Sequence, residues 1–357
     1  MPLHVPEEWL PHIEELLQLP GVTMVIGGVD VGKTTFTTLI ANRAFEAGIP
    51  VAVIDGDMGQ SEIGPPTTVG LGMVEFPIQS LGELHPHALF FVGSTSPVGH
   101  LLATATGVKT LVERALTVGK TLIIVDTTGL VRGSVARKLK THKIELIRPK
   151  HLVAIQKATE LEHILQFFDC WVDCKVHRLA ASPAVKPKSV TLRVQRRATK
   201  FNQYFREGQT YELNLESVGT FGTWLSAGQV LEPKYLKFAS AALGVDVLHG
   251  EMVGRTVYLV TERDYNKKGI EEIQEVFATN SVVVTTASKF TNLIVGLSDK
   301  HLELLGLGIV TSIDFKRAMM RIFTPLRSIS PICAVRFGVI KLRTDGTEIG
   351  RIRPGEI

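Results

Sequence analysis

A glycine-rich segment near the start of the chain has the residues and spacing of a phosphate-binding loop. Residues 27–34 read GGVDVGKT, which fits the pattern G-x-x-x-x-G-K-[ST] in full. Backbone N–H groups of such a loop surround a phosphate chain, Lys33 reaches the β- and γ-phosphates, and the Thr34 hydroxyl ligates Mg²⁺. The segment predicts a site for a nucleoside triphosphate and Mg²⁺, formed by Gly27, Gly28, Val29, Asp30, Val31, Gly32, Lys33, Thr34 and Thr35.

Three acidic side chains follow apolar runs that are typical of buried strands. Asp126 ends TLIIVD, and Asp55 and Asp57 follow PVAVI. The carboxyl ends of parallel strands share one edge of a sheet, where open α/β folds bind ligands. We expect Asp126 to hold Mg²⁺ with Thr34, although a helix-capping role is the alternative. Asp55 and Asp57 are expected to order metal-bound water and to accept the proton of an attacking hydroxyl, unless one of them is only a turn residue.

The segment FVGSTSPVGH, residues 91–100, is a loop of small and hydroxyl-bearing residues after another apolar run. Such a loop can approach a phosphate backbone closely. By itself it indicates only a turn and the start of a helix.

Charge is distributed unevenly along the chain. The whole sequence carries a net charge of +4, but residues 131–210 contain 17 Lys and Arg against 6 Asp and Glu. A basic region of this kind favours contact with a polyanion such as a nucleic acid. A solvated basic surface with no ligand is the alternative.

Strands alternate with helices over the first half of the chain, which predicts an α/β fold of the P-loop NTPase type with a mostly parallel sheet. We expect strands at 22–27, 50–55, 88–93, 121–126 and 152–156. Helices are expected at 6–18, after the glycine-rich loop as far as Gly48, and at 99–118 and 158–168.

The pattern changes after residue 180. Residues 181–210 contain a Pro/Lys-rich loop and a basic, partly helical stretch, which we interpret as a lid. Runs such as 256–260, 281–287, 292–297 and 333–342 then predict a smaller mixed β domain. The predicted organisation is an N-terminal helix at 1–20, a P-loop domain at 21–210 and a β-rich domain at 211–357.

Composition limits the class of protein. No apolar run is long enough to span a membrane, and the N-terminus lacks the features of a signal peptide, so we expect a cytoplasmic protein. Three cysteines fit a reducing compartment. Cys170 and Cys174 are four residues apart, but their spacing matches no standard zinc pattern, and buried structural thiols are the better interpretation.

Five short motifs together resemble the polynucleotide 5′-hydroxyl kinase family. That family includes the kinase of the messenger-RNA cleavage and tRNA-splicing machinery and the nucleolar kinase of ribosomal-RNA processing. The motifs occur in the family's order as GGVDVGKTT, DMGQ (57–60), GSTSP (93–97), DTTG (126–129) and the basic RVQRR (193–197) followed by Tyr204 and Phe205. The stretch at 296–314 is also similar to the family's C-terminal domain.

The resemblance implies transfer of the γ-phosphate of ATP, GTP or another NTP to the 5′-OH end of single-stranded RNA or DNA. It implies that Lys33 acts on the phosphates, that Asp57 is the general base with Asp55 as second choice, and that Arg193 and Arg197 stabilise the transferred phosphoryl group. Metal ligands would be Thr34, Asp55 and Asp126. Residues implied to bind the acceptor strand are Gln60, Thr95, Ser96, Pro97, Thr127 and Gly129.

The chain also departs from the larger eukaryotic members. Its P-loop begins at residue 27, so their N-terminal domain is not expected here, and Leu130 stands where they often have Trp. This compact form resembles prokaryotic members that act alone, which implies no obligatory protein partner.

Two other functions compete with this one. A regulatory or metallochaperone-type P-loop NTPase would hydrolyse NTP without transferring phosphate to nucleic acid, but it does not need RVQRR. A non-enzymatic scaffold with a vestigial site is disfavoured by the intact Lys33, Thr34, Asp57 and Asp126.

Overall fold

The computed structural model describes residues 5–185 and 187–357. The chain divides into two compact units, Met1–Arg197 and Ala198–Ile357. This division falls within a single helix, α6 (Val190–Phe205), upstream of the boundary at 210 that composition suggested. Within the basic stretch, residues 190–205 form one continuous helix that spans the division between the units.

The first unit is built around a sheet of seven strands in the order β4-β3-β2-β5-β1-β6-β7. Strands β2, β5, β1, β6 and β7 are parallel. The strands are β1 (Val22–Gly27), β2 (Val51–Gly56), β3 (Thr68–Met73), β4 (Pro86–Phe91), β5 (Leu122–Thr127), β6 (His151–Gln156) and β7 (Lys175–Ala180). The helices are η1 (Glu7–Trp9), α1 (Leu10–Gln18), α2 (Lys33–Glu46), η2 (Leu81–Glu83), α3 (Leu101–Thr117), α4 (Gly133–Ile147) and α5 (Glu162–Leu165).

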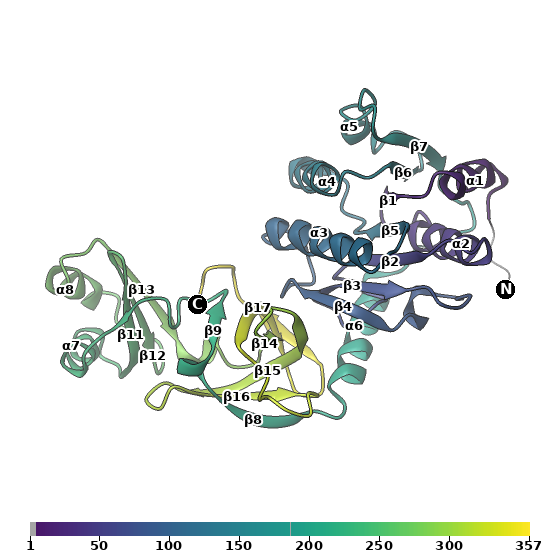
Figure 1. Ribbon diagram of the computed structural model, residues 1–357. Coiled ribbons are helices and arrows are strands. Elements are labelled where there is room, and N and C mark those ends of the chain that lie inside the picture. The colour runs from purple at the N-terminus through teal and green to yellow at the C-terminus, as the bar shows by residue number, and fades with distance from the viewer. Residues whose placement is uncertain (1–4, 186) are drawn as a thin grey trace. The chain divides into compact units, whose positions relative to one another are not determined.

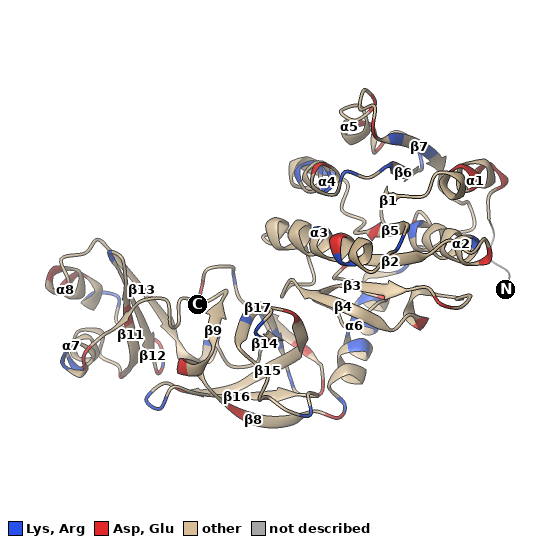
Figure 2. Ribbon diagram, in the orientation of Figure 1, with Lys and Arg blue, Asp and Glu red and all other residues tan. Residues whose placement is uncertain are grey.

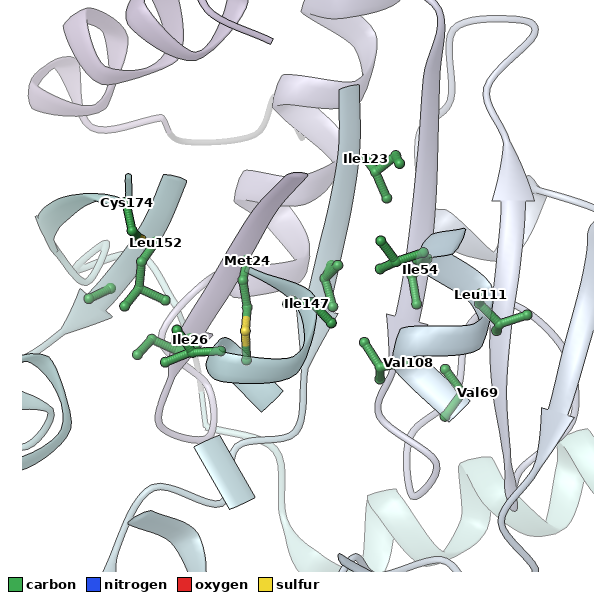
Figure 3. Close-up of a cluster of buried hydrophobic side chains, with 14 of the residues drawn as sticks. Met24, Ile26, Ile54, Val69, Val108, Leu111, Ile123, Ile147, Leu152 and Cys174 are labelled. Carbon is green, nitrogen blue, oxygen red and sulfur yellow. The ribbon is translucent and has the colours of Figure 1, made fainter. Parts of the chain in front are cut away.

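Helices cover both faces of this sheet, so its parallel strands are buried on two sides. Helices α3 and α4 pack on one face and α1 and α2 on the other (Figure 1). Strand residues such as Met24 and Ile54 meet Val108 of α3 in the first core (Figure 3). The predicted α/β fold with a mostly parallel sheet is confirmed.

The predicted strand at 88–93 is present, whereas the predicted long helix at 158–168 was wrong. The run at 88–93 forms β4, which is antiparallel to β3, and β3 in turn is antiparallel to β2. Strand β3 was not predicted because its sequence, TVGLGM, contains two glycines that weaken the strand pattern. A Cβ at Gly70 would lie 2.0 Å from the Ile63 carbonyl oxygen, so close packing requires glycine there. The helix expected at 158–168 is only four residues long.

The second unit contains two sheets, and the predicted mixed β-rich domain is confirmed. One sheet has the order β10-β11-β12-β13 and the other β18-β17-β14-β15-β16-β8, with β9 beside β17. The strands are β8 (Gln209–Asn214), β9 (Gly219–Phe221), β10 (Gln229–Val230), β11 (Val247–Val253), β12 (Thr256–Thr261), β13 (Ser281–Thr286), β14 (Leu293–Ser298), β15 (Leu304–Asp314), β16 (Met319–Thr324), β17 (Ala334–Leu342) and β18 (Glu348–Arg351). Its helical segments are α7 (Pro233–Leu243), α8 (Gly269–Val276), η3 (Leu215–Ser217) and η4 (Ala287–Lys289).

The cysteines are free thiols with different surroundings. Cys174 packs into the first core, as Figure 3 shows. Cys170 is exposed, so the expectation of a buried thiol was wrong for this residue, which lies in the turn before β7. Among the described residues, no helix is long and apolar enough to cross a membrane.

Candidate active site

The glycine-rich loop connects β1 to α2 at the carboxyl edge of the parallel strands. A Cβ at Gly27 would lie 2.6 Å from the Ile155 carbonyl oxygen, so the loop can leave the sheet here only with glycine. Gly32 has a φ of 99°, in the left-handed region, and begins α2. The backbone N–H groups at the start of this helix are therefore free of side-chain obstruction, as a phosphate site requires.

The N-terminal helix supports this loop from behind. The Trp9 indole donates a hydrogen bond to the Ala180 carbonyl oxygen over 3.0 Å and meets the Phe36 ring edge-on, with centroids 5.4 Å apart. A Cβ at Gly32 would lie 3.2 Å from the Trp9 ring. The sequence places Trp9 only within the helix expected at 6–18, because its contact with the loop is non-local.

Lys33 points into the loop itself. Its Nζ donates to the Gly28 carbonyl oxygen over 2.6 Å, and the side chain is only 8% exposed. Burial lowers the pKa of Lys33, whereas the negative charges of Asp126, Asp57 and Asp30 oppose that shift. The ammonium group therefore lies among carboxylates at the position where phosphates are expected to bind.

Asp126 ends β5 beside the start of α2. The Thr34 hydroxyl donates to Asp126 Oδ2 over 2.6 Å, and the Thr127 N–H donates to Asp126 Oδ1 over 2.8 Å. Burial raises the pKa of Asp126, and the Lys33 charge works against this shift. The adjacent hydroxyl and carboxylate are the pair that the sequence predicted for Mg²⁺.

Asp55 is buried at the end of β2, where its oxygens hold the following loop. Oδ1 accepts the Asp57 N–H over 3.0 Å, and Oδ2 accepts the N–H groups of Glu62 and Ile63. Burial, reinforced by the charge of Asp126, raises the pKa of Asp55 to about 7. Its oxygens are largely committed to the protein backbone.

Asp57 lies two residues further along this loop. Its Oδ1 accepts the N–H groups of Gly59 and Gln60, each over 3.1 Å. A Cβ at Gly59 would lie 2.6 Å from the Thr95 carbonyl oxygen, so the Asp57 loop packs directly against the loop at residues 93–97. The structure thus brings the DMGQ and GSTSP motifs together at one edge of the sheet.

The segment preceding α6 is attached to the phosphate loop through Asp30. The Asp30 carboxylate accepts the Lys188 N–H over 2.9 Å and pairs with the Arg193 guanidinium over 2.6 Å. Gln60 Nε2 donates to the Arg193 carbonyl oxygen over 3.3 Å. Figure 2 shows basic residues on α6. The expected helical stretch with Arg193 is therefore in contact with both the P-loop and the Asp57 loop.

These elements enclose a cavity of about 440 Å³. The cavity is lined by most of the residues that the sequence predicted for nucleotide binding, metal binding and catalysis. It is also lined by four residues after β7 that the sequence did not single out, namely Ser182, Ala184, Val185 and Lys188. The lining is Val29, Asp30, Val31, Gly32, Lys33, Thr34, Thr35, Asp55, Asp57, Gln60, Glu62, Asp126, Thr127, Gly129, Ser182, Ala184, Val185, Lys188 and Arg193. Arg197 and the loop residues Thr95, Ser96 and Pro97 lie outside this lining.

After Asp126, the DTTG motif makes contacts that hold the site together. The Thr127 hydroxyl donates to the Val25 carbonyl oxygen over 2.8 Å and accepts from Lys140 over 2.7 Å. A Cβ at Gly129 would lie 3.0 Å from the Val29 nitrogen, so glycine allows this segment to approach the P-loop. The Thr127 hydroxyl was predicted to bind the acceptor strand, but it already makes two hydrogen bonds within the protein.

The residues present fit a Mg²⁺ ion that is carried in with a nucleotide. Among the residues that the structure describes, no group of three His, Cys, Asp or Glu side chains could hold a metal by itself. Mg²⁺ in phosphoryl-transfer sites, however, takes one or two protein oxygens and completes its shell with phosphates and water. Thr34 and Asp126 supply one hydroxyl and one carboxylate oxygen for that purpose.

The site has three features of a P-loop nucleotide-binding protein. A phosphate-binding loop connects β1 to α2, a buried acidic residue ends the neighbouring strand, and a basic helix lies beside both. The sequence profile of the mRNA cleavage and polyadenylation factor CLP1 P-loop family matches residues 27–207. The chain belongs to this family, which confirms the resemblance inferred from its motifs.

Several archaeal proteins are similar to this chain over nearly its whole length. A polyribonucleotide 5′-hydroxyl-kinase of Pyrococcus abyssi is 32% identical over 97% of this chain and 95% of its own length. One from Methanocaldococcus jannaschii is 35% identical over 93% of this chain and 90% of its own. A chain of the solved Clp1p–Pcf11p complex shares the fold, with a TM-score of 0.60 over 94% of this chain and 80% of its own, at 13% identity.

Proposed function

We propose that this protein is a polynucleotide 5′-hydroxyl kinase that transfers the γ-phosphoryl group of ATP, or another NTP, to the 5′-OH end of single-stranded RNA. The observation that carries the proposal is the single cavity in which Asp57 joins the phosphate loop, Lys33 and Asp126. The names of the archaeal relatives support RNA as the acceptor.

The reaction is a direct displacement at the γ-phosphorus. The 5′-hydroxyl oxygen forms a bond to phosphorus, the bond from phosphorus to the β-bridging oxygen breaks, and the hydroxyl proton moves to Asp57. The products are a 5′-phosphorylated strand and a nucleoside diphosphate. Asp57 suits the role of base because its Oδ1 is fixed by two backbone N–H groups, which orient the carboxylate.

The donor nucleotide is held by residues 27–35. Lys33 exchanges its bond to the Gly28 carbonyl oxygen for the β- and γ-phosphates, where its charge is needed most. Thr34 and Asp126 would hold Mg²⁺, which would neutralise charge on the transferring group. Ser182, Ala184 and Val185 line the remainder of the cavity and would lie beside the nucleoside.

Asp55 and Thr127 are assigned supporting roles in place of the predicted metal and acceptor roles. Asp55 accepts several hydrogen bonds from the loop that carries Asp57, so it fixes that loop. Thr127 joins β5 to β1 and to α4. The acceptor strand would instead meet Gln60, the backbone at Gly129 and the loop of Thr95, Ser96 and Pro97.

Arg193 and Arg197 of α6 complete the proposed site. Arg193 lines the cavity and is positioned by Asp30. Arg197 lies one helical turn further on and would approach the phosphates when both substrates are bound. The groups that are assigned roles in this proposal all belong to this chain.

The test is incubation of the purified protein with γ-labelled ATP, Mg²⁺ and RNA or DNA oligonucleotides that carry a 5′-OH. We expect label on the 5′-OH RNA and none on the same RNA with a 5′-phosphate. Lys33→Ala should reduce transfer by at least about 10²-fold, the scale for one lost preorganised electrostatic partner. Release of labelled phosphate with no labelled oligonucleotide would instead identify an NTPase.

A further inference from the structure

Two lysines of α4 are completely buried beneath the candidate active site. Lys140 and Lys143 are three residues apart, so they share one face of the helix, and both are 0% exposed. Lysine is almost never fully buried unless its charge is compensated. Two such residues on one helix therefore require an explanation.

Lys140 has a clear structural role. Its Nζ donates to the Thr127 hydroxyl oxygen and to the Thr128 carbonyl oxygen, each over 2.7 Å. These bonds fix the segment that directly follows Asp126. Loss of Lys140 would leave two buried acceptors without their donor, which destabilises a protein.

Lys143 is different because its Nζ has no hydrogen-bond acceptor among the described residues. It ends beside the backbone between Asp55 and Asp57, since a Cβ at Gly56 would lie 3.7 Å from Lys143 Nζ. That Cβ would also lie 2.8 Å from the Asp126 carbonyl oxygen. Glycine at position 56 thus leaves room for the ammonium group behind the acidic strand ends.

The compensating charges are the carboxylates of the site. Burial lowers the pKa of Lys143 to about 8, whereas the charges of Asp57 and Asp126 act in the opposite direction. Asp55, Asp57 and Asp126 all line one cavity, where like charges repel. Lys33, Lys140 and Lys143 all interact electrostatically with Asp57 and Asp126.

We propose that Lys143 is a positioning residue for phosphoryl transfer, whose buried ammonium group offsets the repulsion between Asp57 and Asp126 and holds the Asp57 carboxylate in its reactive position. It touches neither substrate, because it is buried under the backbone of residue 56. The inference rests on the proposed kinase function. It adds a residue on α4 that no motif of the chain contains.

The decisive variant is Lys143→Met, which keeps the side-chain volume and removes the charge. We expect kcat to fall about 10- to 100-fold, the scale for groups that orient catalytic ligands, with KM for ATP within about twofold of wild type. The melting temperature should fall, because removal of the ammonium group leaves the repulsion between the buried carboxylates without compensation. Lys138→Met, the same change at an exposed lysine of α4, should leave all three quantities unchanged.

A double-mutant cycle with Asp57→Asn tests whether Lys143 acts through Asp57. If it does, Lys143→Met should reduce the residual rate of Asp57→Asn by less than about twofold. A normal kcat in Lys143→Met, or equal effects in both backgrounds, would overturn the proposal. Absence of transfer in the wild-type protein would refute the kinase function itself, and this inference with it.

Discussion

At the scale of single residues, the structure separates the two carboxylates that the sequence left as alternatives. Asp55 and Asp57 both follow β2, but Asp55 accepts hydrogen bonds from several groups of its own loop. Asp57 accepts two N–H groups, both at one oxygen, although both carboxylates line the cavity. The difference depends on the path of residues 58–63, which no local pattern predicts.

Asp57→Asn should lower kcat by about 10²- to 10⁴-fold, the scale for a lost general base, while leaving nucleotide binding intact. The amide keeps the shape of the side chain but cannot accept the proton of the attacking hydroxyl. The measurements are kcat with a 5′-OH RNA and the Kd of ATP by calorimetry. A parallel loss of ATP binding and transfer would make Asp57 a metal residue instead.

The arginines of α6 give a second prediction at this scale. Arg197→Ala should lower kcat far more than it weakens ATP binding. The reason is that the Arg197 guanidinium would contact the transferring phosphoryl group only in the transition state. Arg193→Ala should also raise KM for ATP, since it removes the ion pair with Asp30 of the P-loop.

The two arginine substitutions should be non-additive if both side chains act on one phosphoryl group. Arg196→Ala, at an exposed position of the same helix, is the matched control. Near-normal kcat in the Arg193/Arg197 double variant would remove α6 from the mechanism.

At the scale of elements, a chain of three histidines joins α1 to the edge of the sheet. His12 Nδ1 and His177 Nδ1 are 3.1 Å apart, as are His177 Nε2 and His151 Nδ1, and His151 Nε2 is 2.8 Å from the Leu19 carbonyl oxygen. Because that carbonyl can only accept, His151 donates to it, and each ring can then donate to the next in neutral form. Trp9, at the end of the adjoining η1, lies behind the P-loop.

Acid should therefore destabilise the first unit. Burial, together with the charge of His151, lowers the pKa of His177 from 6.5 to about 4, although Glu15 opposes the shift. Between these values the unfolded state binds more protons, so the free energy of unfolding rises with pH across this window and is level above it. His177→Gln should flatten this slope in denaturant titrations between pH 4 and pH 6.5, whereas His163→Gln at an exposed position should not. An unchanged slope in His177→Gln would contradict the assignment.

At the scale of the whole molecule, the excess of positive charge over residues 131–210 predicts salt-dependent binding of the acceptor strand. Each phosphate neutralised by Lys or Arg contributes about −0.7 to the slope of log K against log salt for a single strand. Fluorescence anisotropy with a 5′-OH RNA should give a negative slope that is several times this value. A slope near zero would exclude residues 131–210 as the binding site of the RNA strand.

The sequence by itself determined the phosphate loop, the acidic strand ends, the β-rich second half and the family, because each depends on local spacing or apolar periodicity. It did not reveal β3, whose glycines are required by packing against Ile63, or the short length of α5. Nor did it reveal Trp9, Lys140 and Lys143 as neighbours of the site. The two lysines counted only as part of a basic surface, and their burial on α4 is set by contacts with strands far away in the chain. Tertiary structure alone decided which charges lie inside the protein, since desolvation and pairing depend on packing and leave no periodic trace in the sequence.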